Sequence, residues 1–359
     1  MTSDSNLFYI ILVVNANGSH LEWVKMKRKL KIIGSSLMII LILAFSIFSI
    51  VYFSHKDKEG KVVVTIFPIY DICREILGSE EEIVMLQDNG SDMHSYQATA
   101  GDIVTISKAE LFIMIGGESD DWVGDVIRSS NNVNLDTLSL MDIVIKVEES
   151  DENISEGGHD HNHEEGEYDE DHDHEEKEYD EHIWLSVKNM IVATEGIRDE
   201  LLKIFPERTE IIKENSTRYL GELQALEEEY SEALLGSNGF YLVADRFPFI
   251  YLMRDYGLSY HAAFSGCSAE TEASAETMAE LRDKVDSKNL KCIYITETSD
   301  GDIANMVKNS SKNPDEIEIL VLNSCQSVSR NDLGNISYID IMLDNLTKLK
   351  KGVGYDING

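Results

Sequence analysis

Residues 61–77 read KVVVTIFPIYDICREIL, and this stretch indicates the class of fold. The β-branched run over residues 61–67 suits a strand that is buried on both faces. Pro68 suits the first turn of a helix, because the backbone N–H that proline lacks is unpaired there anyway, and we expect this helix to run through Leu77. A buried strand that passes directly into a helix is typical of α/β folds.

The same alternation continues through the first half of the chain. Residues 83–86 and 111–115 are further apolar runs that favour strands. Between them, Thr99 and Asp102 match a capping box, which predicts a helix that continues to Lys108. Strands that alternate with helices imply a parallel sheet with helices on both faces.

A long helix separates this half from the next. We predict it over residues 206–235, because apolar side chains recur there at steps of three and four. At a rise of 1.5 Å per residue it would be about 43 Å long, enough to cross a whole domain. Beyond it we expect strands over residues 241–244, 292–296 and 319–322, helices over residues 248–256, 301–308 and 336–349, and one more helix capped by Ser274.

The predicted fold is therefore two α/β lobes with central, mostly parallel sheets, joined by one long helix and preceded by a membrane segment. The N-terminal lobe would cover residues 60–205, with an acidic insertion at 148–181. Residues 206–235 would form the linking helix, and residues 236–352 the C-terminal lobe.

The N-terminal region has the pattern of a membrane anchor. Residues 32–53 carry no charge and, at ~1.5 Å per residue, can span a hydrocarbon layer of ~30 Å. Basic residues cluster just before this run, at Lys25, Lys27, Arg28, Lys29 and Lys31. By the positive-inside rule, residues 1–31, whose true start could be Met26, would be cytoplasmic. We therefore expect a cell-membrane protein whose lobes lie on the extracytoplasmic face, held by a single N-terminal anchor.

The formal net charge of −35 is unevenly distributed. Residues 148–181 hold eighteen acidic residues and one lysine. This balance excludes nucleic acid as an expected partner, because binding to phosphates needs clustered lysine and arginine. The segment has few apolar residues with which to offset the entropy of ordering, so the sequence predicts a disordered loop.

Histidines alternate with the acidic residues of this loop. They are His159, His161, His163, His172 and His174. Neutral imidazoles suit zinc, copper or nickel, and carboxylates add oxygen ligands. The pattern indicates weak metal binding at several places, and the alternative is a merely solvated acidic loop.

The four cysteines are Cys73, Cys267, Cys292 and Cys325, and none belongs to a CxxC pair. A structural zinc site built on cysteines is therefore not expected. A Cys267–Cys325 disulfide would be compatible with an extracellular location, and buried free thiols are the alternative.

Two other histidines lie in more informative surroundings. His94 precedes the capped helix, at a turn, and His182 stands where the acidic loop ends and an apolar, strand-like stretch begins. Both are close to the ends of predicted strands of one lobe, where open α/β sheets place their ligand sites.

Three segments around these histidines closely resemble the zinc- and manganese-binding proteins of ABC importers. They are VVVTIFPIYDICREILG (62–78), SDMHSYQATAGDIVTISKAELFIMIGG (91–117) and DEHIWLSVKNM (180–190). The resemblance extends over about residues 61–350 and implies that His94 and His182 are the metal ligands of the N-terminal lobe. Both motifs depart from the family pattern, because Met93 and Glu181 replace its prolines.

The resemblance also implies ligands from the C-terminal lobe. Asp245 stands at the end of the first strand of that lobe, and Asn323 follows its last strand. His261 and Glu272 are the alternatives, and Glu270 lies beside the latter in the segment CSAETEAS.

The function implied by the resemblance is capture of a divalent transition metal and its delivery to an ABC importer, made of a permease and its ATPase. No enzymatic activity is expected, because a metallohydrolase would need a motif such as HExxH, which the sequence lacks. Zn²⁺ is favoured over Mn²⁺, because two imidazoles suit a borderline metal whereas manganese prefers mainly oxygen ligands. A manganese-specific binding protein and a surface metal buffer or adhesin without a transporter stay open as alternatives.

Overall fold

The computed structural model describes residues 60–88, 90, 93–149, 154–155, 178–266 and 273–353. The predicted anchor at residues 32–53 and most of the acidic loop lie outside these ranges. Within them, no helix has the length and apolar character needed to cross a membrane.

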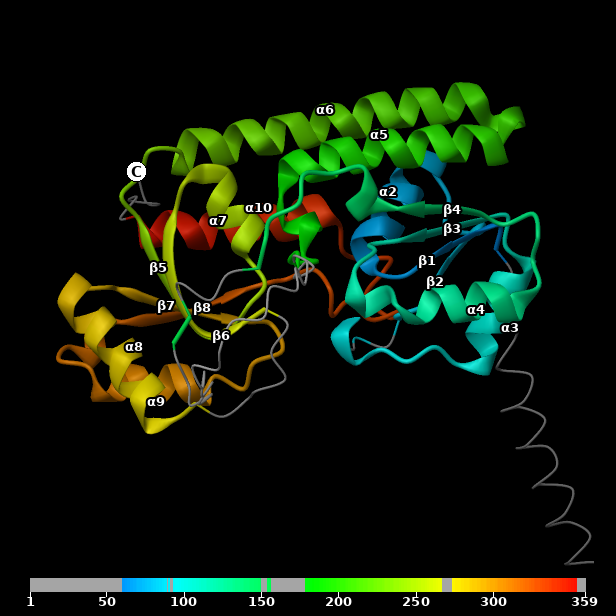
Figure 1. Cartoon of the computed structure of the whole chain (residues 1–359). Coiled ribbons are helices and arrows are strands. Elements are labelled where there is room, and N and C mark those ends of the chain that lie inside the picture. The colour runs from blue at the N-terminus through cyan, green and yellow to red at the C-terminus, as the bar shows by residue number, and fades with distance from the viewer. Residues whose placement is uncertain are drawn as a thin grey trace, which may run out of the picture. The chain divides into compact units, whose positions relative to one another are not determined.

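Two parallel sheets of four strands each form the centres of two lobes (Figure 1). The N-terminal sheet has the order β2–β1–β3–β4, with β1 at Val62–Val64, β2 at Ile83–Met85, β3 at Leu111–Met114 and β4 at Asp136–Ser139. The C-terminal sheet has the order β6–β5–β7–β8, with β5 at Phe240–Phe247, β6 at Ser259–Ser265, β7 at Cys292–Thr296 and β8 at Glu318–Leu322. The predicted pair of α/β lobes with parallel sheets is confirmed.

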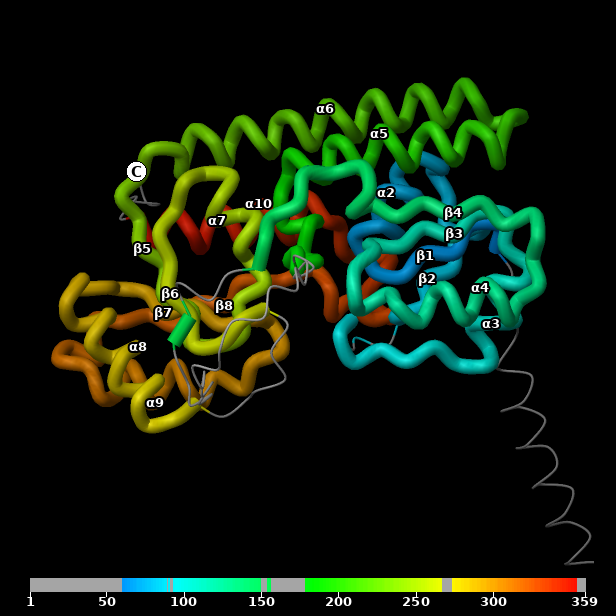
Figure 2. Tube along the Cα trace, in the orientation of Figure 1, coloured from blue at the N-terminus to red at the C-terminus, as the bar shows by residue number. Residues whose placement is uncertain are grey.

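Helices cover these sheets and connect the lobes. The N-terminal lobe holds α2 at Phe67–Leu77, α3 at Ala100–Lys108 and α4 at Trp122–Ser130. The C-terminal lobe holds α7 at Ile250–Tyr256, α8 at Ala275–Lys288, α9 at Asp302–Ser310 and α10 at Tyr338–Gly352. The helix α6 at Thr209–Leu234 extends along one side of both lobes, and α5 at Val187–Ile204 runs beside it over the N-terminal lobe, as Figure 2 shows.

The ends of several helices follow from their local sequence. In α3, the Thr99 side chain accepts a hydrogen bond from the Asp102 N–H, and the Asp102 carboxylate accepts one from the Thr99 N–H at 2.7 Å. The predicted capping box is thus confirmed. At the end of α2, Gly78 has a φ of +63°, a left-handed conformation that glycine adopts without a Cβ penalty.

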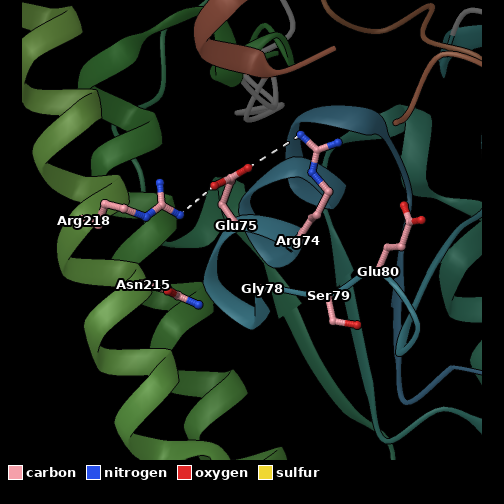
Figure 3. Close-up of a pocket in the computed structure, with 7 residues that line it drawn as sticks. All are labelled: Arg74, Glu75, Gly78, Ser79, Glu80, Asn215 and Arg218. Carbon is pink, nitrogen blue, oxygen red and sulfur yellow. Dashed lines mark hydrogen bonds and ion pairs between the residues drawn. The ribbon is translucent and has the colours of Figure 1, made fainter. Parts of the chain in front are cut away.

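The linking helix α6 packs against α2 of the N-terminal lobe and α10 of the C-terminal lobe. Its predicted apolar stripe is buried, and comprises Ile212, Tyr219, Leu223, Leu226, Tyr230 and Leu234. These side chains belong to one cluster of buried residues that extends through both lobes. On the outer surface, Arg218 of α6 pairs with Glu75 of α2 at 2.7 Å, beside a shallow pocket (Figure 3).

Among the α-helices and strands of the described residues, four were not predicted, namely α4, β4, α5 and β6. The stretch after His182 is not strand-like, because Ile183–Leu185 forms a 3-10 turn that leads into α5. Cys73, Cys292 and Cys325 are buried free thiols, and Cys267 lies outside the described residues. Burial raises the pKa of all three thiols, which keeps them protonated.

Candidate metal centre

His94 and His182 lie against each other, although 88 residues separate them in the sequence. Their Nε2 atoms are 3.2 Å apart, and the two rings are tilted by 58° with their centroids at 5.1 Å. His94 belongs to the 3-10 turn Met93–Ser95 that follows β2, and His182 directly precedes the turn Ile183–Leu185. His182 is fully buried and the His94 side chain is 17% exposed, so water reaches the pair from the His94 side.

Asp180 orients the imidazole of His182. The two oxygens of this buried carboxylate lie 3.1 and 3.3 Å from His182 Nδ1, and one of them also accepts the His182 backbone N–H at 2.8 Å. A carboxylate partner places the ring proton on Nδ1 and leaves the lone pair on Nε2 for a metal.

Ser119 and Glu181 orient the imidazole of His94. Ser119 belongs to the 3-10 turn Glu118–Asp120 after β3, and its Oγ lies 2.8 Å from His94 Nδ1. The Ser119 hydroxyl donates to Glu181 Oε2, and its backbone N–H donates to Glu181 Oε1 at 2.8 Å. Since the hydroxyl has one proton, its oxygen must accept from His94 Nδ1–H, which leaves the lone pair of His94 on Nε2 as well.

The surroundings of the two rings are negatively charged and largely buried. Asp120, Asp180 and Glu181 are all buried, and Asp120 accepts the Gly116 N–H at 2.9 Å. Burial raises the pKa of Asp120 to about 6 and also raises the pKa of Glu181, where the two hydrogen bonds from Ser119 act in the opposite direction. Such a cluster favours a cation at the histidine pair.

The spacing of the two Nε2 atoms fits one zinc ion. Two lone pairs that face each other at 3.2 Å repel unless a proton or a cation lies between them. Two Zn–N bonds of about 2.0–2.1 Å at a tetrahedral angle place their nitrogens about 3.3–3.4 Å apart. Among the described residues, no group of three or more histidine, cysteine or acidic side chains is placed to hold a metal ion.

The predicted ligand Asp245 is bound to the backbone at the end of β5. Its Oδ2 accepts from the Thr296 N–H at 3.0 Å and from the Thr296 hydroxyl at 2.5 Å, and its Oδ1 accepts the Arg246 N–H at 2.8 Å. These bonds join β5 to the end of β7. Within the described residues, the hydrogen bonds of Asp245 are to Arg246 and Thr296 rather than to the histidine pair.

Asn323 is also engaged locally. Its Oδ1 accepts the Cys325 N–H at 2.8 Å, within a turn in which Cys325 has a φ of +64°. The Asn323 backbone exchanges two hydrogen bonds of 2.8 Å with the amide of Asn345 in α10. Through these hydrogen bonds, Asn323 fixes the conformation of the segment after β8 and joins it to α10.

The alternative ligand His261 lies within β6 and faces α8. Its Nε2 is 3.0 Å from Glu280 of α8 and 3.1 Å from the Ser155 hydroxyl, whereas its neighbour Ala262 packs into the main core on the other face. Burial lowers the pKa of His261, and Glu280 opposes this shift. The other predicted donors, Glu270, Glu272 and the loop histidines His159, His161, His163, His172 and His174, lie outside the described residues.

Gly266 of the C-terminal lobe lies directly against the histidine pair, a contact that the sequence did not predict. A Cβ at this position would lie 3.1 Å from His182 Cε1, 3.3 Å from Asp180 Oδ2 and 2.8 Å from the carbonyl oxygen of Phe247. Ser119 was missed too, although it follows a predicted strand in the segment GGESD. The only sequence signal for Asp180 is its place in the DEH motif.

Both ends of the acidic insertion contact the C-terminal lobe. The two ends of the insertion pair at Glu149 and Glu178, here called its neck, where the Glu149 N–H donates to Glu178 O at 3.0 Å. Beside the neck, the Tyr251 hydroxyl of α7 donates to Asp180 O at 2.6 Å. Further along, the Ser155 N–H donates to Ala262 O of the edge strand β6 at 2.9 Å. The insertion therefore starts and ends where the lobes meet.

Comparisons with curated proteins identify zinc-binding relatives. The zinc-binding lipoprotein AdcA of Streptococcus pneumoniae is 28% identical over 327 residues, which cover 90% of this chain and 61% of that protein. The high-affinity zinc uptake system protein ZnuA of Bacillus subtilis is 26% identical over 299 residues, which cover 82% of this chain and 88% of that protein. The chain thus spans about three fifths of the length of AdcA.

Solved structures show the same fold. The Zn(II)-bound ZnuA-like domain of Streptococcus pneumoniae AdcA gives a TM-score of 0.65 at 24% identity, covering 83% of this chain and 100% of that one. The periplasmic zinc-binding protein TroA of Treponema pallidum gives 0.63 at 20% identity, covering 82% and 99%. A family model described as zinc-uptake complex component A, periplasmic, matches residues 62–352. The resemblance predicted from the sequence is therefore confirmed, and the chain belongs to the family of the zinc-uptake complex component A.

Proposed function

We propose that this chain is an extracytoplasmic binding protein that captures zinc between its two lobes and delivers it to the permease and ATPase of an ABC importer. The observation that carries the proposal is the 3.2 Å approach of His94 Nε2 and His182 Nε2, each with its Nδ1 held by an acceptor. Membership of the zinc-uptake family supports zinc as the cargo. A component of an uptake complex would bind its metal rather than catalyse a reaction on it.

The first coordination shell would start from His94 and His182. Zinc takes about four ligands in a tetrahedral arrangement, so two more positions need donors. The resemblance implies Asp245 and Asn323 as donors, with water, His261 or Glu272 as the alternatives. The hydrogen bonds that both Asp245 oxygens accept favour one of the alternatives over Asp245. Glu272 follows Gly266 within a few residues of sequence, and the backbone of Gly266 adjoins His182.

Release of the metal would depend on the importer. The lobes are joined by the long helix α6 and share one buried core, which limits hinge opening compared with flexible connecting strands. Ligands in a closed, buried site exchange slowly, so the importer would have to move the lobes apart to accept the zinc.

The parts outside the described residues would serve location and supply. We infer that residues 32–53 anchor the protein in the cell membrane, with the lobes outside the cytoplasm. The histidines of the acidic loop would collect zinc weakly near the site, because the neck of this loop lies beside Asp180 and Asp180 contacts His182.

The test is zinc binding by His94→Ala and His182→Ala variants. Each removes one of the paired imidazoles, so affinity measured by competition with a chelator should fall by orders of magnitude while circular dichroism stays unchanged. Glu195→Ala, at an exposed site on α5, is the control and should keep wild-type affinity. His261→Ala tests the alternative ligand in the same assay, and a fall in its affinity would make His261 a donor. Tight zinc binding by His94→Ala would refute the assignment.

The identity of the metal needs a competition experiment. The protein would be loaded with equal zinc and manganese, and the bound metals measured by mass spectrometry. We expect zinc to be retained, because imidazole nitrogens suit zinc better than manganese. Preferential retention of manganese would overturn the proposal.

A further inference from the structure

We propose that Glu181, acting through Ser119, is a positioning residue that sets the tautomer of His94 and so prepares its Nε2 for zinc. This inference rests on the proposed function, since it assigns a role to residues behind one of the two histidines.

The polarity of this hydrogen-bond chain is fixed by a backbone group. The Ser119 N–H can only donate, and it donates to Glu181 Oε1 at 2.8 Å. The other carboxylate oxygen, Oε2, accepts the Ser119 hydroxyl proton. The Ser119 oxygen then presents a lone pair to His94 Nδ1 at 2.8 Å, which requires a proton on Nδ1.

The fold makes room for this carboxylate. The Glu181 side chain is only 5% exposed, so water does not compete strongly for its oxygens. Gly117, with a φ of +89°, lies directly against it, and a Cβ there would overlap the carboxylate. A buried carboxylate whose two oxygens both receive protons from Ser119 is held in a single orientation.

Replacement of Glu181 by glutamine should reverse the direction of the hydrogen bonds that link His94, Ser119 and residue 181. The amide oxygen must take the place of Oε1, because it faces the fixed Ser119 N–H. The amide NH₂ group then faces the Ser119 oxygen and donates to it. The Ser119 hydroxyl proton has to turn toward His94 Nδ1, which shifts the ring proton to Nε2 and blocks the atom that faces His182.

The experiment measures tautomer and affinity separately. Long-range ¹H–¹⁵N NMR at alkaline pH on the metal-free His182→Ala protein, in which no second Nε2 faces His94, reports which ring nitrogen of His94 carries the proton. We expect Nδ1–H in His182→Ala and Nε2–H once Glu181→Gln is added. Zinc affinity should be about 10–100-fold weaker in Glu181→Gln alone, as for other partners of ligating histidines. Glu195→Gln, an exposed site on α5, changes the charge equally and should alter neither property.

A double-mutant cycle tests whether the effect passes through Ser119. Glu181→Gln should weaken zinc binding far less in a Ser119→Ala background than alone, because the relay is already broken. The inference is overturned if Glu181→Gln keeps Nδ1–H and wild-type affinity, or if its effect is undiminished in Ser119→Ala. Failure of the proposed function would look different, since His94→Ala itself would then bind zinc tightly.

Discussion

The Oδ2 atom of Asp71 in α2 accepts a hydrogen bond of 2.8 Å from the backbone N–H of Tyr338, the first residue of α10. The two residues lie 267 positions apart and belong to different lobes. Asp71 also pairs with Arg74, whose guanidinium donates to the carbonyls of Leu333 and Ile336. A buried carboxylate of the N-terminal lobe thus holds the start of a helix of the C-terminal lobe, where the helix dipole favours negative charge.

Asp71→Ala should destabilise the contact between α2 and the start of α10. The substitution leaves the Tyr338 N–H without an acceptor and Arg74 without its carboxylate, so the free energy of unfolding should fall by about 1–3 kcal/mol. Urea denaturation followed by fluorescence measures the change. Asp283→Ala, on the exposed face of α8, is the control and should be nearly neutral. Equal stability of the two variants would contradict a role for Asp71 in joining the lobes.

The contribution of Asp71 to the free energy of unfolding should also depend on pH. Burial raises the pKa of Asp71 from its ordinary 3.8 to about 6, against the opposing effect of Arg74. The folded state therefore holds the proton more tightly than the unfolded state, so this group stabilises the fold most below about pH 4 and progressively less as the pH rises to about 6. The difference in unfolding free energy between wild type and Asp71→Asn should decrease across that window and stay constant above it. A constant difference from about pH 4 to 7 would refute the raised pKa.

Gly266→Ala should disturb the approach of the C-terminal lobe to His182. The new Cβ would lie 2.8 Å from the Phe247 carbonyl, a backbone atom that cannot move aside as a flexible side chain would. We expect zinc affinity to fall by about 10–100-fold, as for other changes beside a ligating histidine. Gly221→Ala in α6 meets no atom within 4 Å and should instead stabilise the helix, by about 0.5–1 kcal/mol. Unchanged affinity in Gly266→Ala would show that this contact does not shape the site.

Much of the fold could be predicted because local signals and burial agree. Cys292–Thr296 is a strand with the predicted bounds, since an apolar, β-branched run of that length has no helical periodicity. The capping box of α3 acts within one turn and is therefore readable from four residues. The prediction that His94 and His182 lie together rested on their motifs rather than on hydrophobic periodicity.

Other features depend on contacts that the sequence does not reveal. In β5 the pairing with β6 shifts register between Val243 and Arg246, and Asp245, which lies in the shifted stretch, accepts a hydrogen bond from the Thr296 N–H. A bulge of this kind has no local sequence signature. The prediction of Asp245 as a ligand rests instead on the family resemblance and on its place at the end of a strand. The 3-10 turn after His182 was missed because its buried residues, Ile183, Trp184 and Leu185, also suit a strand.

The loop histidines should bind zinc weakly and separately from the paired site. Replacement of His159, His161, His163, His172 and His174 by asparagine keeps the length and acidity of the loop. Calorimetric titration should lose the weak zinc equivalents and keep one tight equivalent. The neck should persist, because the hydrogen bond between Glu149 and Glu178 is made by backbone atoms. Loss of the tight equivalent would place essential ligands in the loop.

Asp245→Ala separates two roles for the predicted ligand of the C-terminal lobe. If Asp245 is a metal ligand, its removal should lower zinc affinity and leave the stability of the fold largely unchanged. A structural carboxylate should do the opposite, and the hydrogen bonds from Thr296 and Arg246 to both Asp245 oxygens favour this outcome. We expect the free energy of unfolding to fall by about 1–3 kcal/mol, because the Thr296 N–H is left without its acceptor.

The measurement pairs denaturation with chelator competition on the same Asp245→Ala sample. Asp245→Asn is the matched variant, because its amide oxygen can still accept from the Thr296 N–H and should recover part of the stability. If Asp245 is structural, affinity stays at the wild-type level in both variants while stability falls in the order wild type, asparagine, alanine. If zinc affinity instead falls at least tenfold in both and stability does not change, Asp245 reaches the metal in the zinc-bound state, and its bonds to Thr296 belong to the metal-free form alone.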